Sequence, residues 1–367
     1  DTSFVVKEHC AGYPRVLVQP DGKVIVGKCG PWHNPPAVIR LLSDGSRDPG
    51  FTPGMTAPTS DISALALQDD GKILVAGDFT NYNGIAANRL VRLNPNGSLD
   101  TAFLATCSGP NDAIYVLRAL HDGKVMVGGA FTEFNGAERR GIARLNSDGT
   151  LDTTFLPHGG GVSGGQSTVY HIGVLENGGI LVAGRFFEMN GVWLNYVQFC
   201  RLHPDGSLDG SFRAPFQFEY GPIVPLPDGR IVVGCTSPPF ILQLNADGSL
   251  DQSFSMENRL NCGISSIARQ PDGKLVIGGS FSSCGGMKRY GIARLLPDGQ
   301  LDPVFVEGGH PRYWHHQVSD MQIAGDGRLV VVGAFSDMNG YDAPGVARLY
   351  LGTLPTILLH PVSQRIV

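Results

Sequence analysis

The dipeptide Asp-Gly, or a close variant of it, recurs seven times in the same setting, and this repetition restricts what the chain can fold into. Each copy lies between two short runs of alternating apolar character, such as residues 64–68 and 72–77. A two-residue Asp-Gly loop between such runs predicts a β-hairpin with both loop residues at positive φ. Successive turn glycines are 49, 52, 55, 51, 44 and 54 residues apart, which indicates a repeated unit. The seven copies are Asp21-Gly22, Asp70-Gly71, Asp122-Gly123, Asn177-Gly178, Asp228-Gly229, Asp272-Gly273 and Asp326-Gly327.

The second copy shows the repeated unit most clearly. Its expected strands are residues 62–68, 72–79, 89–94 and 98–103, and a second tight turn at Asn96-Gly97 precedes the fourth strand. Four antiparallel strands in each of seven units predict an all-β fold, a seven-bladed β-propeller. We expect the propeller to occupy residues 1–353. Residues 1–4 are expected to complete the last blade as its fourth strand and so remove an exposed sheet edge; the alternative is that residues 353–358 fill it.

The repeat also resembles a known family. The run 68–79, followed by Arg92-Leu93-Asn94 and Gly97-Ser98-Leu99-Asp100, is similar to the delta-60 repeat of large bacterial surface and secreted proteins. The resemblance covers about 350 residues and implies a propeller in an extracellular or cell-surface setting. It implies no catalytic residues. Residues 354–367 resemble a linker or the start of a following immunoglobulin-like module.

Composition excludes several classes of function. The net charge is −5 with interspersed signs, so nothing supports binding to nucleic acid. No apolar run approaches the ~20 residues that span a bilayer, and the chain shows no signal peptide. No cofactor motif is present, because the glycines at 159–161 and 164–165 lack the Lys-Ser/Thr of a phosphate loop. Seven cysteines allow a Cys262–Cys284 disulfide or a weaker Cys10–Cys29 pair, and free buried thiols are the alternative.

Residues repeated in every unit are interpreted as scaffold. An arginine in the third strand and an aspartate in the fourth are expected to form a bidentate pair. A phenylalanine after the aspartate should pack between blades, and a glycine in the second strand should mark a bulge or a close approach. The arginines are Arg40, Arg92, Arg144, Arg201, Arg294 and Arg348, with Gln243 in the fifth unit.

Function is expected on one face of the disc. The tight turns after the first and third strands share one face, whereas the long, irregular loops share the other, so a site should lie on the irregular-loop face. All three tryptophans and most histidines map there. Carboxylates on that face, Asp320 among them, are scattered, so no glycosidase pair can be chosen. No metal site is expected, because the adjacent His315 and His316 face opposite ways on a strand.

The expected ligand-binding residues combine aromatic rings with cationic and imidazole groups: Trp32, Tyr115, Tyr170, Trp193, Arg312, Tyr313, Trp314 and His315. Such a set suits a glycan, because indole and phenol faces stack on sugar rings and Arg312 could hold a uronate or sulfate. The sequence therefore favours an extracellular binding module for a glycan or another polymer. The first alternative is a polysaccharide lyase with catalytic candidates Tyr170, His171, Arg312, Tyr313, His315 and His316. The second is a structural scaffold that docks a protein partner.

Overall fold

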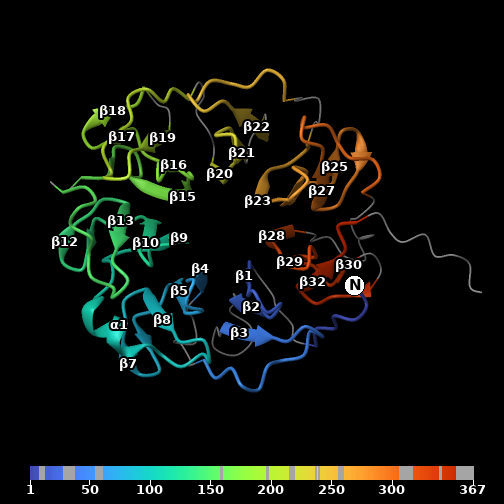
Figure 1. Cartoon of the computed structure of the whole chain (residues 1–367), viewed down its shortest axis with the longest axis horizontal. Coiled ribbons are helices and arrows are strands. Elements are labelled where there is room, and N and C mark those ends of the chain that lie inside the picture. Colours follow the sequence, from blue (N-terminus) through green and yellow to red (C-terminus); the bar gives the residue numbers. More distant parts are fainter. Residues whose placement is uncertain are drawn as a thin grey trace, which may run out of the picture.

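Antiparallel sheets arranged like wedges around a common axis make up the structure, a computed structural model of the 367-residue chain (Figure 1). It describes residues 1–7, 13–27, 38–53, 61–157, 160–195, 198–214, 220–235, 238, 240–254, 260–305, 317–338 and 341–352. Within these ranges, seven main sheets of three strands each contain one Asp-Gly-type hairpin. We number them one to seven in chain order. The all-β propeller fold predicted from the sequence is confirmed.

In each main sheet the first strand lies innermost and the middle strand pairs with both others. The first strands are β1 (Arg15–Val18), β4 (Ile62–Leu67), β9 (Ile114–Ala119), β15 (Thr168–Val174), β20 (Tyr220–Pro225), β23 (Ile264–Arg269) and β28 (Gln317–Ile323). The middle strands are β2 (Val24–Gly27), β5 (Ile73–Gly77), β10 (Val125–Gly129), β16 (Ile180–Arg185), β21 (Ile231–Cys235), β24 (Leu275–Gly279) and β29 (Leu329–Ala334). The third strands are β3 (Val38–Leu41), β8 (Leu90–Leu93), β13 (Ile142–Leu145), β19 (Phe199–Leu202), β22 (Ile241–Leu244), β27 (Ile292–Leu295) and β32 (Val346–Leu349).

The prediction of a fourth strand in each sheet is wrong for the described residues. The segment after the third strand forms only a single antiparallel bridge, such as Leu93 with Leu99. In the second repeat this segment continues as the short helix α1 (Thr101–Thr106), and the side chain of Asp100 caps it by accepting from Phe103 N. The aspartate carboxylate accepts hydrogen bonds from backbone N–H groups two or three residues further along the chain. This favours a local turn over pairing of the segment with the third strand.

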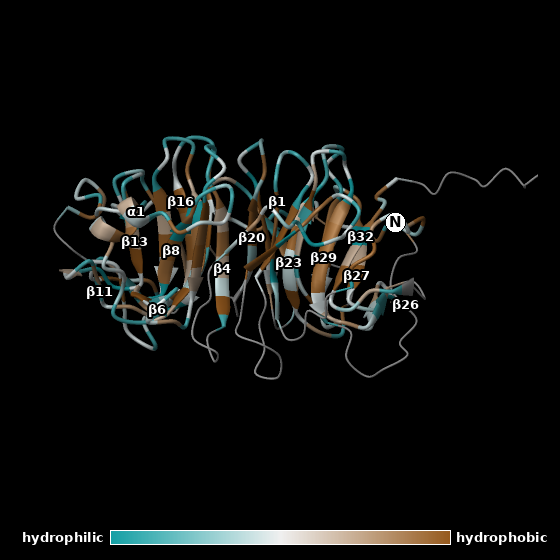
Figure 2. Cartoon of the chain, turned by 90° about the horizontal axis from the view of Figure 1, so that it is seen from below, coloured by the Kyte–Doolittle hydropathy of each residue, from teal (hydrophilic) through white to brown (hydrophobic). Residues whose placement is uncertain are grey.

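The loops that follow the middle strands form small two-stranded ribbons (Figure 2). They lie on the face opposite the tight turns, as the positions of β6, β11 and β26 show. The described loops on the irregular-loop face therefore contain regular secondary structure. The ribbons are β6 (Asn81–Tyr82) with β7 (Ile85–Ala86), β11 (Glu133–Phe134) with β12 (Ala137–Glu138), β17 (Glu188–Met189) with β18 (Val192–Trp193) and also with β14 (Val162–Ser163), β25 (Ser283–Cys284) with β26 (Met287–Lys288), and β30 (Asp337–Met338) with β31 (Tyr341–Asp342).

The Asp-Gly hairpins differ in detail from the expected two-residue turns. In sheet two, Gln68 N donates to Lys72 O and Gly71 N donates to Gln68 O, so the loop has three residues. Only Gly71 has positive φ, at 80°, and Asp70 Oδ1 instead accepts from Lys72 N. This is a type I turn followed by a glycine bulge, in which glycine supplies the left-handed residue and aspartate stabilises the turn.

The expected bulge in the first two strands is confirmed. In sheet four the register shifts between Val169 and His171, which leaves Tyr170 as the extra residue. A Cβ atom on the facing Gly184 would lie 1.9 Å from Thr168 O, so only glycine fits there.

Five of the third-strand arginines join their own sheet to the next one, and Arg92 shows the contacts. Arg92 Nε donates to Asp100 Oδ2 at 2.9 Å, while Nη1 donates to Ser147 O in sheet three. The guanidinium also lies 4.3 Å from the centroid of the Phe103 ring. The expected bidentate pair is therefore wrong: one N–H group contacts the carboxylate, and another crosses the interface. The expected packing of phenylalanine between sheets is confirmed, because Phe103 belongs to a core cluster drawn from sheets two and three.

The aspartates of these pairs remain ionised at neutral pH. Burial alone raises the pKa of Asp209, but hydrogen bonds from Ser211 and Arg201 outweigh burial and lower that pKa to about 2. The pairs consequently stabilise the fold above the ordinary aspartate pKa, and this stabilisation is lost as the pH falls towards 2.

Sheet five departs from this arrangement. Gln243 replaces the arginine and donates to Asp251 Oδ2 at 2.7 Å, while Arg230 of the neighbouring strand supplies the positive charge at 3.1 Å. Gln243 is shorter than arginine, and a cavity of about 80 Å³ remains between it and Pro297 of sheet six. Asp251 therefore still has a positively charged partner, but the space between sheets five and six is less tightly packed.

Residues 1–7 lie against the last sheet. Asp1 Oδ2 accepts from Arg348 Nε at 2.8 Å, and the Arg348 guanidinium lies 4.6 Å from the centroid of the Phe4 ring. These contacts match those of the other pairs, with the aspartate supplied from the opposite end of the chain. Phe4 and Val6 also belong to a core cluster that joins sheets one and seven. No strand forms within residues 1–7.

The predicted Cys262–Cys284 disulfide does not form. Both thiols are free, and the sulfur of Cys262 lies 3.0 Å from Ser280 Oγ, because Ser280 takes the position facing it. Cys284 is fully buried, and burial raises the pKa of its thiol to about 11. Cys10 and Cys29 lie outside the described residues. No helix in the described part of the chain is long and apolar enough to cross a membrane.

We expect Arg92→Gln to lower the free energy of unfolding by about 2 kcal/mol, because the variant loses a charge-assisted hydrogen bond and the link to sheet three. Urea denaturation monitored by circular dichroism measures this loss. The control is Arg140→Gln, which removes an exposed pair with Glu138 and should cost less than about 0.5 kcal/mol. Equal costs for the two variants would contradict the role given to the inter-sheet arginine.

Candidate functional site

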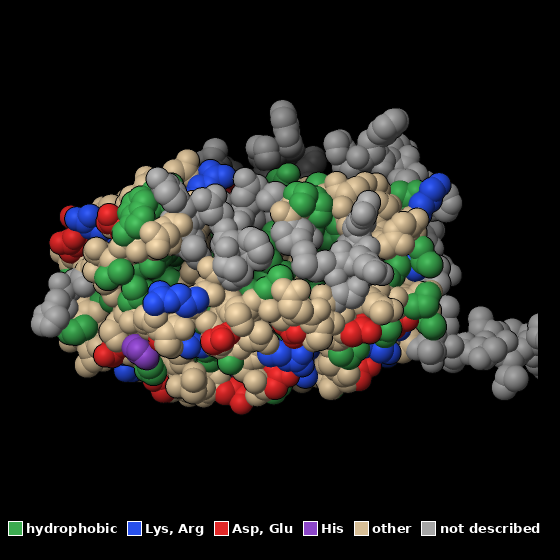
Figure 3. All heavy atoms as spheres, turned by 90° about the horizontal axis from the view of Figure 1, so that it is seen from above, with side chains coloured by type: hydrophobic (Ala, Val, Ile, Leu, Met, Phe, Trp, Pro, Cys, Tyr) green, Lys and Arg blue, Asp and Glu red, His purple; other side chains and the backbone are tan. Residues whose placement is uncertain are grey.

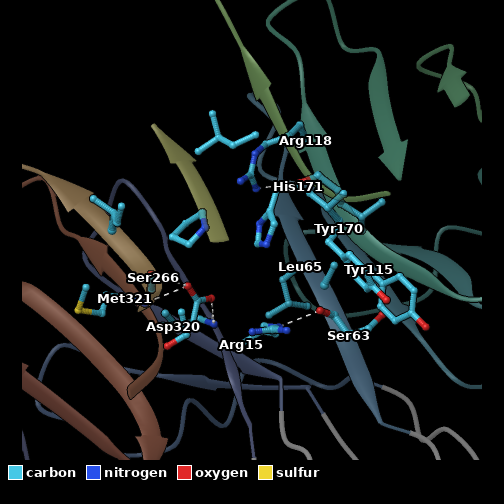
Figure 4. A pocket seen from close by; sticks show the side chains of 18 of the residues that line it. Arg15, Ser63, Leu65, Tyr115, Arg118, Tyr170, His171, Ser266, Asp320 and Met321 are labelled. Carbon is cyan, nitrogen blue, oxygen red and sulfur yellow. Dashed lines mark hydrogen bonds between the residues drawn. The ribbon is translucent and has the colours of Figure 1, made fainter. Parts of the chain in front are cut away.

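A cavity of about 530 Å³ lies at the centre of the ring and is lined by residues of the first strands (Figure 4). The bulge in these strands decides which side chains enter it. In three sheets the extra residue is a serine whose hydroxyl donates to a carbonyl of the next sheet; Ser63 Oγ donates to Ile114 O at 2.6 Å, and Ser319 Oγ to Pro14 O at 2.8 Å. Sheets three and four carry Tyr115 and Tyr170 instead; both line the cavity, and in Figure 4 their rings lie together to one side of the charged side chains.

The two tyrosines form one wall near the end of the cavity where the first strands begin. Their ring centroids are 5.1 Å apart with an interplanar angle of 45°, and 39% of Tyr115 is exposed. Both strands begin on the irregular-loop face, so the pair borders the cavity on that face. A partly exposed aromatic pair of this kind offers an apolar surface with polar hydroxyl tips.

Charged side chains lie deeper in the cavity. Arg15, His171 and Asp320 pair with Gly27, Ala183 and Val332, which occupy equivalent positions after the turn glycines. They therefore form one layer of the cavity wall, and Arg118 lies one layer below. Figure 4 shows all four side chains directed into the same space.

Both arginines are held by neutral partners. Arg15 Nε donates to Ser63 O at 2.8 Å, and Arg118 Nε donates to Ile172 O at 3.0 Å. Neither has a carboxylate within 4.0 Å among the described residues. Asp320 instead accepts from the backbone N–H groups of Val16, at 3.1 Å, and Met321, at 2.9 Å. The guanidinium charges are thus oriented but not neutralised by contact.

This environment disfavours a positive charge on His171. The surrounding protein limits its hydration, and repulsion from Arg118 and Arg15 adds to this effect, so the pKa of the imidazole falls well below its ordinary value of 6.5. Burial raises the pKa of Asp320, although Arg15 offsets part of that shift. At neutral pH the cavity therefore contains a neutral imidazole and an excess of positive charge.

A second group of side chains continues outward across sheet four. Arg185 lines the cavity and donates to Gln166 Oε1 at 3.0 Å. Two residues further along the chain, Phe187 contacts Trp193 of β18 with ring centroids 5.7 Å apart. The indole is 47% exposed. We call Phe187 and Trp193 the aromatic platform.

The structure describes only part of the predicted site. It brings Tyr115, Tyr170 and His171 together in the lining of the cavity, and it places Trp193 outside the cavity, in the small sheet β14-β17-β18 of the same repeat as Tyr170. Six predicted residues, Trp32, Arg312, Tyr313, Trp314, His315 and His316, lie outside the described residues.

Sequence reasoning missed Arg15, Arg118 and Arg185 as site residues and treated Asp320 as one scattered carboxylate. Aligning the first strands on their turn glycines would have found Arg15 and Asp320, because the equivalent residues in sheets two and three are Ala64 and Val116. Within the described ranges, no group of three or more His, Cys, Asp or Glu side chains could hold a metal ion.

Taken together, the fold and the cavity define an all-β propeller with a polar central channel. A family model described as "domain of unknown function (DUF5122) beta-propeller" matches residues 68–103, 121–155, 175–212, 226–254, 270–305 and 324–349, which is more than half of the chain. The chain belongs to this propeller-repeat family, and the repeat resemblance predicted from the sequence is confirmed at that level. No curated protein matches the chain in sequence.

Solved propellers share the fold at low identity. The WD40 beta-propeller domain of Doa1 has a TM-score of 0.62 and 12% identity, with 95% of this chain and 96% of that chain covered. A streptogramin B lyase has a TM-score of 0.56 and 14% identity, with 95% and 96% covered. The extracellular domain of a putative one-component system from B. thetaiotaomicron has a TM-score of 0.54 and 13% identity; 95% of this chain is covered, but this chain spans only 39% of that one. These similarities show the fold alone.

We expect His171 to remain neutral between pH 8 and pH 5, because its hydration is limited and two arginines repel a further positive charge. A pH titration of its imidazole resonances by NMR measures this directly. Arg118→Gln should move the pKa of His171 upward towards 6.5, whereas the distant Arg140→Gln should leave it unchanged. Titration of His171 near 6.5 in the unsubstituted protein would refute this description of the cavity.

Proposed function

We propose that the protein is an extracellular or cell-surface propeller module that binds a glycan on its irregular-loop face. The observation that carries this proposal is the line of side chains from the cavity across sheet four. It begins at Tyr115 and Tyr170, passes Arg185 and ends at the aromatic platform. Rings separated by a polar side chain suit a polymer of sugar units, because the apolar faces of the sugars stack on rings while their hydroxyls find polar partners.

The distribution of charge supports the choice of face. In the edge view of Figure 3, acidic and basic side chains gather along the edge that carries the tight turns, and hydrophobic side chains are exposed on the wall beside it. A charged rim of this kind offers fewer apolar surfaces for stacking on sugar rings than the irregular-loop side, where Trp193 is exposed. The extracellular setting draws support from the structural similarity to the extracellular domain of the one-component system.

The runner-up is a polysaccharide lyase that uses the same channel. A neutral imidazole beside two guanidinium groups is a specific observation in its favour, because His171 could accept a proton from a sugar carbon while an arginine neutralises an adjacent carboxylate. Incubation with acidic polysaccharides distinguishes the two functions: unsaturated products would establish a lyase, and binding without turnover the module. Binding to a protein partner in place of any glycan would instead indicate a scaffold.

Trp193→Ala is expected to weaken binding to a glycan ligand found on a polysaccharide panel by about tenfold, because a stacking surface is lost. Affinity electrophoresis against that polysaccharide measures the loss. Lys288→Ala is the matched control, since Lys288 occupies the corresponding ribbon position in sheet six. If both variants bind as well as the unsubstituted protein, the platform is not part of the site.

We further propose that the ring has seven blades and that residues 1–7 close it. The contacts of Asp1 and Phe4 with Arg348 support this, as does the core cluster shared by sheets one and seven. Closure predicts that Phe4→Ala lowers the melting temperature by several degrees, because the side chain is 93% buried between the two ends of the chain. The control is Val5→Ala at a neighbouring, 55% exposed position. Equal melting temperatures for both variants would argue against closure by this segment.

A further inference from the structure

We propose that the central channel binds one anionic group of a sugar, a carboxylate or a sulfate, between Arg15 and Arg118. This inference deepens the proposed glycan-binding function by naming the chemical class of the sugar. It also assigns a role to charged residues that the stacking surfaces leave unexplained.

The first support is the unbalanced charge. Among the described residues that line the channel, Arg15, Arg118 and Arg185 are positive and Asp320 contributes at most one negative charge, so this lining carries a positive excess whether or not that carboxyl is ionised. Protein interiors rarely hold charges that no opposite charge balances. An anion entering the channel would meet two guanidinium groups already oriented by their bonds to carbonyl oxygens.

The second support is the number of free donor positions. Each guanidinium has five N–H donors. Arg118 directs Nε to Ile172 O and Nη1 to Leu117 O, at 3.0 and 3.2 Å, and its Nη2 has no partner among the described residues. The carboxylate of Asp320 is already engaged by backbone N–H groups, so it competes poorly for these donors. A carboxylate or sulfate oxygen has the geometry that guanidinium N–H groups prefer.

The third support is the order in which the aromatic and charged side chains follow one another along the axis of the channel. Tyr115 and Arg118 lie on the same strand, β9, and three residues of strand correspond to about 10 Å. A sugar ring resting against Tyr115 and Tyr170 could therefore direct an acidic substituent towards the arginines. Neutral His171 lies in the layer of Arg15, between the tyrosines and Arg118, and offers a further hydrogen-bonding group without adding charge.

The alternatives are less consistent with these contacts. A metal cation would be repelled by both arginines, and within the described ranges no ligand cluster for one exists. A purely structural role for the arginines would need only their Nε bonds to carbonyl oxygens, which uncharged donors could also make. A cavity of about 530 Å³ is large enough for a small-molecule group.

Chemical-shift titration by NMR with three probes tests the proposal: glucuronate, the neutral sugar glucose and inorganic sulfate. We expect glucuronate and sulfate to shift the resonances of His171, and glucose to bind at least about tenfold more weakly, since it lacks the charge. Raising the ionic strength should weaken binding of both anions. A preference for glucuronate over sulfate would assign the group as a carboxylate, and the reverse preference as a sulfate.

Two charge substitutions with opposite expected signs separate electrostatics from structural damage. Arg118→Gln should weaken glucuronate binding about tenfold, and Asp320→Asn should strengthen it, because the first removes attraction and the second removes repulsion. Arg140→Gln is the charge-matched control on the surface and should have no effect. If Arg118→Gln fails to fold, Arg15→Gln provides the same test, with melting curves as the check on folding.

Equal binding of glucose and glucuronate, or equal behaviour of Arg118→Gln and Arg140→Gln, would overturn the inference. The outcomes also separate it from the proposed function. Neutral polysaccharides that bind through Trp193, without any response to glucuronate or sulfate, would refute the anion site and leave the glycan module standing. Anion binding in the channel without affinity for any polysaccharide would support the anion site and refute the glycan-binding module.

Discussion

The structure depends on a guanidinium group shared between two sheets. In most repeats the third-strand arginine donates to an aspartate of its own sheet, donates to a carbonyl of the following sheet and covers a phenylalanine ring. One side chain thereby combines a charge-assisted bond, an inter-sheet bond and an aromatic contact. Because each sheet is too small to bury its own apolar faces, these links and the core clusters between neighbouring sheets decide whether the wedges assemble.

Because the contacts that join the sheets involve the third strands, the residue types that face the channel from the first strands can vary. The bulge position holds serine where a hydroxyl links neighbouring sheets and tyrosine where the side chain enters the channel. The next position along the strand ranges from alanine to arginine, histidine and aspartate without altering the ladder. A repeated scaffold can therefore carry an asymmetric site, and here the asymmetry is concentrated on sheet four and the channel wall beside it.

The period of the Asp-Gly turns was enough to predict the propeller and the inter-sheet role of phenylalanine. The fourth strand was predicted wrongly, because the alternating pattern after the third strand is typical of a further strand. The aspartate within it instead accepts hydrogen bonds from nearby backbone N–H groups, and this local turn ends the ladder. The Cys262–Cys284 pairing failed because a ribbon after the middle strand turns Cys284 into the core. Tyr115, Tyr170 and His171 were predicted from their place at strand starts, and the structure places all three in the lining of the cavity. Arg15 and Arg118 were missed because a single charged residue within a short apolar strand is visible only when repeats are aligned.

The glutamine at position 243 has a mechanical consequence for the joint between sheets five and six. Five of the arginines bond across to the following sheet, but between sheets five and six a small void replaces that bond. This joint therefore lacks a contact that five of the arginines supply elsewhere, and we expect sheets five and six to separate more readily under tension or heat than sheets that an arginine bridges.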